Sequence, residues 1–124
     1  MHAPRPFRIA ITLFYFLICC YLFFTSGSQF PKEDWLDRIF FDKWVHVGLF
    51  ALLTVLLVWS EFVQGNNQGR WVAVAGIVYG ALVEVVQGLW VPFRSADIFD
   101  FLSDSVGVLL ALYVLERRKK SKPL

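Results

Sequence analysis

Four long runs of apolar residues, separated by short polar segments, set the plan of this chain. The runs cover residues 7–24, 44–62, 71–90 and 98–115, and each is 18 to 20 residues long. A helix of about 20 apolar residues crosses the hydrocarbon core of a bilayer, which is about 30 Å thick. The runs are too long and continuous for the strands of a membrane barrel. The pattern therefore predicts an all-α fold, a four-helix transmembrane bundle.

Composition agrees with a membrane protein of one domain. Hydrophobic residues make up 57% of the chain and charged residues only 18%, against about 25% charged residues in a soluble domain. The connectors between the runs contain helix breakers, among them Pro31, Gly65 and Pro92. We expect residues 1–124 to form a single integral membrane domain. The first run has an alternative interpretation as a signal peptide, but it is longer than the usual apolar segment of one, so a retained helix is expected.

The distribution of Lys and Arg predicts the orientation in the membrane. With four spans, the two termini and the second connector share one side, which carries eight of the 12 basic residues. The positive-inside rule places that side in the cytoplasm. Most of the excess lies in the tail at residues 117–122, which is typical of an anchor on anionic lipid. We therefore expect no nucleic-acid partner.

Ionisable residues inside the apolar runs are the main indication of function. His46, Glu84, Asp100 and Asp104 lie within runs or at their ends, and a charged side chain inside a membrane span costs about 3 kcal/mol. They should therefore face one another or a polar cavity. In the predicted orientation they all fall in the outer half of the bilayer.

Spacings of three or four residues place polar side chains on one face of each of three helices. These sets are Asp42 with His46, Glu84 with Gln87, and Asp97 with Asp100 and Asp104. A bundle would bury the three faces together. Ser95 or Asp97 is a candidate N-cap of the last helix.

Three segments resemble the VanZ-like family of small membrane proteins. Residues 41–50 are similar to its D-K-x-x-H-x-x-x-F segment, residues 79–87 to its Y-x-x-x-x-E-x-x-Q helix, and residues 94–107 to its R-x-x-D-x-x-D-x-x-x-N-x-x-G segment. One position departs from the family pattern, because Asp104 stands where Asn is expected. The resemblance implies a multi-pass protein of the bacterial cytoplasmic (inner) membrane. The family is named for a protein that lowers bacterial sensitivity to the glycopeptide teicoplanin, and the resemblance assigns no reaction to this chain.

The polar residues form one candidate site at the outer face. The candidate acid–base groups are His46, Glu84 and Asp100. The candidate substrate-binding residues are Asp42, Lys43, Gln87, Arg94, Asp97 and Asp104. Each group also has a structural interpretation, as an interfacial ion pair, as a tether of the third connector or as contacts between helices. Such carboxylates and a histidine can ligate Mg²⁺ or Zn²⁺, but no ligand spacing is diagnostic, so we expect no metal or other cofactor.

Two classes of function remain open from the sequence. In the first, the site binds or modifies the head group of a membrane lipid or lipid-linked envelope precursor, with Lys43 and Arg94 contacting its phosphate or carboxylate oxygens. In the second, the protein is a small exporter of cationic or amphiphilic compounds. The first run carries no acidic residue, and transport favours charge near the bilayer midplane, so we rank head-group binding first. A structural partner protein is third, and a homo-oligomer stays open.

Overall fold

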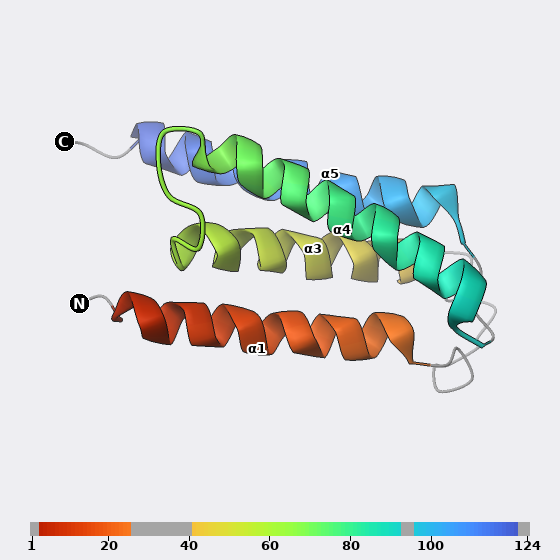
Figure 1. Cartoon of the computed structure of the whole chain (residues 1–124). Helices are drawn as coiled ribbons and strands as arrows, with labels where there is room; N and C mark the ends of the chain where they lie inside the picture. The colour runs from red at the N-terminus through yellow and green to blue at the C-terminus, as the bar shows by residue number, and fades with distance from the viewer. Residues whose placement is uncertain (1–2, 26–40, 93–95, 122–124) are drawn as a thin grey trace.

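The computed structural model describes residues 3–25, 41–92 and 96–121, with side chains given for all of these except residues 41, 42, 120 and 121. The described residues form four helices and no strand. Figure 1 labels them α1 (Arg5–Phe24), α3 (Phe41–Trp59), α4 (Gln68–Trp90) and α5 (Ile98–Ser121). The predicted all-α, four-helix fold is confirmed.

The helices differ from the predicted runs mainly at α3. Three stretches are long and apolar enough to cross a membrane, namely Arg5–Phe24, Gln68–Trp90 and Ile98–Lys119. The apolar stretch of α3, Lys43–Trp59, has 17 residues and is shorter. The run predicted to continue to residue 62 ends early because the chain turns at Glu61, whose φ is 54°. The second predicted span, residues 44–62, is therefore the helix Phe41–Trp59, whose described apolar stretch is shorter than those of the other three helices.

The four helices lie roughly side by side along one common direction, and both ends of the chain lie at the same end of the bundle (Figure 1). Helix α3 contacts α1, α4 and α5, and its contact with α5 is the most extensive. Helix α4 likewise contacts the other three helices, so α3 and α4 together join the bundle. Large apolar side chains on α1, α4 and α5 point outward, as expected for helices in lipid.

The α3–α5 contact depends on a glycine. A Cβ atom at Gly107 would lie 3.1 Å from the backbone nitrogen of Ala51. Small residues allow helix backbones in membranes to approach this closely. The register of α5 against α3 is fixed here, and this register decides which polar residues of the two helices meet.

Aromatic side chains fill the middle of the bundle. Phe23 and Phe50 are buried, with ring centroids 5.6 Å apart. Tyr79 lies 5.5 Å from Phe50 between centroids, and Val83 and Val108 complete the core. This apolar layer separates the two polar ends of the bundle.

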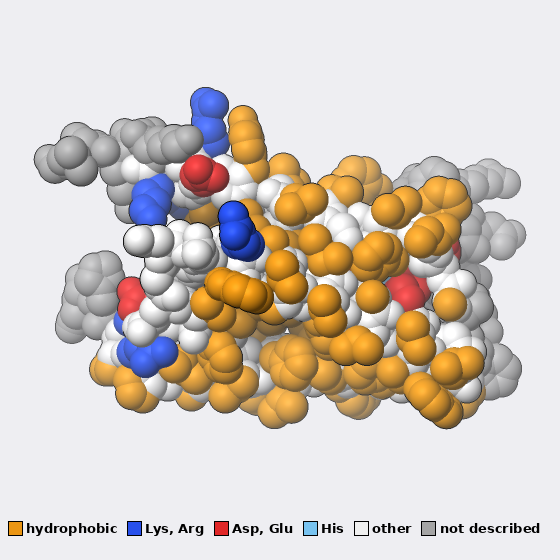
Figure 2. Space-filling model, turned by 45° about the horizontal axis from the view of Figure 1, so that its top comes forward, with side chains coloured by type: hydrophobic (Ala, Val, Ile, Leu, Met, Phe, Trp, Pro, Cys, Tyr) orange, Lys and Arg blue, Asp and Glu red, His pale blue; other side chains and the backbone are white. Residues whose placement is uncertain are grey.

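Basic side chains gather at the end that holds the chain termini, as Figure 2 shows for one face. At this end Arg8 Nη1 donates a hydrogen bond of 2.5 Å to the carbonyl of Trp59, and Arg5 Nε and Nη2 donate to the carbonyl of Glu61 at 3.2 and 3.1 Å. Carbonyl groups at the end of a helix lack partners within it and favour positive charge. The start of α1 therefore caps the end of α3.

Candidate functional site

Three helices bring their ionisable residues together at the opposite end of the bundle. His46 of α3, Glu84 of α4, and Asp100 and Asp104 of α5 have exposed fractions of only 1%, 6%, 7% and 0%. The prediction that these four side chains point into the bundle is confirmed. We use the name polar cluster for these four residues with Lys43 and Asp97.

The deepest contact of the polar cluster joins His46 to Asp104. His46 Nδ1 and Asp104 Oδ1 are 2.5 Å apart, and both side chains are buried. The Phe23 ring packs against the imidazole, with centroids 5.2 Å apart. Gly80 makes room for Asp104, since a Cβ atom there would lie 3.1 Å from the Asp104 Cβ. Asp104 thus places a carboxylate against the imidazole of His46, which fixes the orientation of the ring.

Lys43 closes the cluster on its more exposed side. Its Nζ donates to Asp100 Oδ1 at 2.7 Å and to Asp97 Oδ2 at 2.9 Å, and its side chain is 25% exposed. The hydrogen bond from Lys43 holds the pKa of the Asp97 carboxyl below its ordinary value, and the backbone N–H of Phe99 lowers it further. Lys43 therefore ties α3 to the first turn of α5 by two charge-assisted hydrogen bonds.

Asp97 connects three parts of the site. Its Oδ1 accepts a hydrogen bond of 2.9 Å from the N–H of Phe99, so it is the N-cap of α5, one of the two predicted candidates. Its Oδ2 binds Lys43. Its own backbone N–H donates to Glu84 Oε1 at 3.1 Å. This residue sets the position of α5 relative to both α3 and α4.

Gln87 lies near the cluster but contacts the backbone of α1. Its Nε2 donates a hydrogen bond of 2.9 Å to the carbonyl of Phe23, in the last turn of α1. A carbonyl in the last turn of a helix has no N–H donor within that helix, so the buried Gln87 amide supplies the missing hydrogen bond at the end of α1. The structure therefore gives Gln87 a packing contact, in addition to its predicted place beside the site.

Two predicted site residues are outside what the structure describes. The backbone of Asp42 belongs to α3, but its side chain is not described, and Arg94 lies in the segment 93–95. Phe23 and Gly80 are not among the predicted site residues because they carry no charge, yet they pack against His46 and Asp104. Their only signal is position: Gly80 lies four residues before Glu84, on the same face of α4.

Two hollows open beside the polar cluster. The α4–α5 pocket has a volume of about 360 Å³ and is lined by Ala81, Glu84, Ala96, Asp97, Ile98 and Phe101. The α3–α5 groove has a volume of about 670 Å³ and is lined by Lys43, Trp44, Val47, Phe99, Leu102, Ser103 and Val106. The groove is apolar except at Lys43 and Ser103, whereas the pocket reaches the carboxylate of Glu84.

The described part of the cluster has an excess of negative charge. Lys43 supplies one positive charge, while Glu84, Asp97, Asp100 and Asp104 supply four carboxylates, so the formal charge is −3 with all four ionised and His46 neutral. Buried carboxylates in this number require protons, cations or cationic partners. The site can therefore hold or move protons and can bind cations.

Comparisons with protein-family models, curated proteins and solved structures find no significant match to this chain.

Proposed function

We propose that this chain is a bacterial inner-membrane protein of the VanZ-like type that binds the phosphorylated head group of a lipid-linked envelope compound. The observation that carries the proposal is the position of Lys43, which lines the apolar α3–α5 groove and also contacts the polar cluster. A lipid has the same arrangement, with an apolar chain attached to a polar head. The groove would take the chain, and the head group would lie at Lys43.

The groove suits an acyl or isoprenoid chain. Its walls are Trp44 and Val47 from α3 and Phe99, Leu102 and Val106 from α5. Sites for apolar ligands are lined by such side chains, with few polar groups that fix orientation. Ser103, whose hydroxyl donates to the Phe99 carbonyl at 2.8 Å, adds a polar atom along the groove.

The orientation that we propose places the polar cluster at the outer leaflet. Described basic residues at the other end of the bundle, near the termini, include Arg5, Arg8 and Arg70. The positive-inside rule then puts the termini in the cytoplasm. Lipid-linked envelope precursors are used on the outer side of this membrane, where the cluster would meet them and where an effect on glycopeptide sensitivity would arise.

His46 is the acid–base candidate if the bound head group also reacts. Asp104 holds one ring nitrogen, and the other, Nε2, lies 3.9 Å from Asp100 Oδ2. A histidine oriented by a carboxylate is a common arrangement for proton transfer. Glu84, whose carboxylate lines the α4–α5 pocket, is placed to receive such a proton.

The experiment is mass spectrometry of lipids that copurify with the protein in mild detergent. We expect a phosphorylated lipid to copurify with the wild type and to be reduced at least about tenfold in Lys43→Met, because a charge-assisted contact is removed. Lys119→Met, an exposed residue at the other end of α5, is the matched control and should retain the lipid. Equal lipid content in wild type and Lys43→Met would refute the proposal.

A cellular assay tests the same site. His46→Ala, Glu84→Gln and Arg94→Ala should each abolish the change in glycopeptide or envelope-stress sensitivity that the protein confers, while membrane abundance stays normal. Arg94→Lys should fail as well if the head group needs a planar, two-pronged donor. Variants that behave like wild type would show that the cluster serves helix packing instead.

A second candidate, a small exporter of cationic compounds, is favoured by the excess of carboxylates over Lys43 in the described cluster. The cluster lies toward one end of the bundle and not at its middle, which favours the first proposal. Uptake of a fluorescent cation into proteoliposomes distinguishes the two. An exporter should drive uptake of the cation into the vesicles, and Glu84→Gln should abolish this uptake. A protein that only binds a head group should drive no uptake of the cation.

A further inference from the structure

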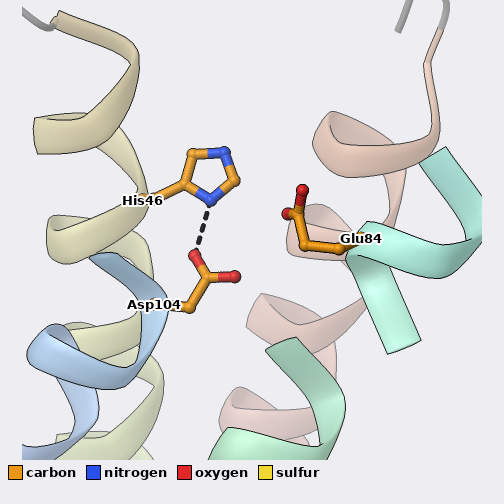
Figure 3. Close-up of side chains that lie close together, drawn as sticks. All are labelled: His46, Glu84 and Asp104. Carbon is orange, nitrogen blue, oxygen red and sulfur yellow. Dashed lines mark hydrogen bonds and ion pairs between the residues drawn. The ribbon is translucent and has the colours of Figure 1, made fainter. Parts of the chain in front are cut away.

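Three buried side chains from three different helices converge inside the polar cluster. His46, Glu84 and Asp104 each offer one ligand atom, and these atoms all lie within 4.8 Å of one another. Figure 3 shows the Glu84 carboxylate facing the His46 ring, with Asp104 against the same ring. One nitrogen and two carboxylate oxygens at this separation can surround a single small cation.

An independent observation, a buried carboxylate oxygen of Glu84, points to a ligand at this place. Glu84 is buried, with an exposed fraction of 6%. Its Oε1 accepts a hydrogen bond from the backbone N–H of Asp97. Its Oε2 is buried and has no hydrogen-bond partner among the described residues. Leaving a buried acceptor of this kind unsatisfied is unfavourable, more so for a carboxylate than for a neutral group.

Lys43, the one lysine or arginine among the residues of the polar cluster, does not supply the missing partner of Glu84 Oε2. Lys43 Nζ is held by Asp97 and Asp100, at 2.9 and 2.7 Å. Its charge therefore balances the edge of the cluster, and Glu84 and Asp104 lie deeper. A divalent cation would reduce the formal charge of the described cluster from −3 to −1.

We propose that His46, Glu84 and Asp104 bind one Zn²⁺ ion. One imidazole with two carboxylates suits a borderline cation, whereas Ca²⁺ takes six to eight oxygen ligands and Mg²⁺ prefers oxygen and several waters. A site of three protein ligands leaves a coordination position open for a water or a substrate oxygen. The ion would take the place of the hydrogen between His46 Nδ1 and Asp104 Oδ1, and the proton of the neutral imidazole would then lie on Nε2, the nitrogen 3.9 Å from Asp100 Oδ2.

The ion would also account for how an acidic cluster accepts a phosphate. Through its open coordination position, the Zn²⁺ ion would present positive charge to an anionic head group, which the carboxylates alone would repel. The metal site itself stands on the geometry of the three ligands and on Glu84 Oε2. It does not depend on the proposed lipid function.

The test is equilibrium binding of Zn²⁺ to the full chain in detergent, purified with an affinity tag that contains no histidine and stripped with a chelator. We expect one Zn²⁺ per chain in competition with a chromophoric chelator, and binding at least about 100-fold weaker in His46→Ala, Glu84→Gln and Asp104→Asn. The matched controls are His2→Ala and Glu61→Gln, which should bind as the wild type does. Absence of stoichiometric Zn²⁺, or undiminished binding in Glu84→Gln, would overturn the inference.

X-ray absorption of the wild-type protein with Zn²⁺ keeps the test decisive if the variants fail to fold. The expected shell holds one imidazole nitrogen and oxygen atoms at about 2.0–2.2 Å. A sulfur ligand at about 2.3 Å would assign the ion to Cys19 or Cys20 and overturn the inference. Zinc binding without a copurified phospholipid supports the metal site and refutes the lipid proposal, and a lipid without zinc does the reverse.

Discussion

Replacing Lys43 by Met should destabilise the bundle, because two carboxylates near the membrane interior lose their cation. The ammonium makes hydrogen bonds of 2.7 and 2.9 Å to Asp100 and Asp97. A hydrogen bond to a charged group contributes about 1.5–3 kcal/mol. Because the lysine side chain is 25% exposed, the lower value applies to each bond, and Lys43→Met should cost about 3 kcal/mol.

A double-mutant cycle separates this pairing from general effects of the substitutions. Asp100→Asn alone should cost about 1.5 kcal/mol by weakening one bond. In the background of Lys43→Met the same change should cost nothing, because it removes a carboxylate that has lost its cation. The predicted coupling is therefore at least about 1.5 kcal/mol, well above the 0.3–0.5 kcal/mol or so that independent sites show.

The assay is reversible unfolding in mixed micelles, followed by the fluorescence of the tryptophans at fixed detergent composition. Lys119→Met, at the other end of α5, is the control and should lie within about 0.5 kcal/mol of the wild type. Additive effects of Lys43→Met and Asp100→Asn, within about 0.5 kcal/mol, would show that the contact between the two residues contributes no stability.

Three further predictions address packing and topology. Gly107→Leu should cost at least about 1–3 kcal/mol, because its side chain would meet the backbone of α3; Gly48→Leu, where no atom lies within 4 Å of the added Cβ, should be near neutral in the same unfolding assay. Gln87→Leu should cost about 1–3 kcal/mol, since a buried carbonyl of α1 loses its donor, and Gln64→Leu at an exposed position is its control. A reporter fused after Leu124 should be active only in a form that works in the cytoplasm; activity of a periplasmic reporter instead would invert the proposed orientation.

Much of the fold follows from the sequence because apolar length and charge placement act locally. The cost of an isolated charge in lipid predicts that Glu84, Asp100 and Asp104 face inward, and helical spacing assigns Asp97, Asp100 and Asp104 to one face. Both inferences require only the residue's own helix. The described ionisable residues that are buried at this end, His46, Glu84, Asp100 and Asp104, are those that the sequence predicts to face inward.

The particular partners could not be predicted, because they depend on how the helices are rotated and shifted against one another. The pairing of His46 with Asp104 requires the register set by Gly107 and the space left by Gly80. The bond from the Asp97 N–H to Glu84 depends on where the start of α5 lies against α4. Spacing along one helix contains none of this information, and it also gave no reason to favour a metal.

The position of Lys43 at the start of α3 has a consequence for the surrounding membrane. Its side chain is 25% exposed and that of its partner Asp97 is 36% exposed, so charged groups reach the surface at this end of the bundle. In a bilayer, charged side chains near the end of a span draw in water and head groups. An ion or a head group would therefore meet Asp100, which Lys43 contacts at 2.7 Å, without first crossing the hydrocarbon.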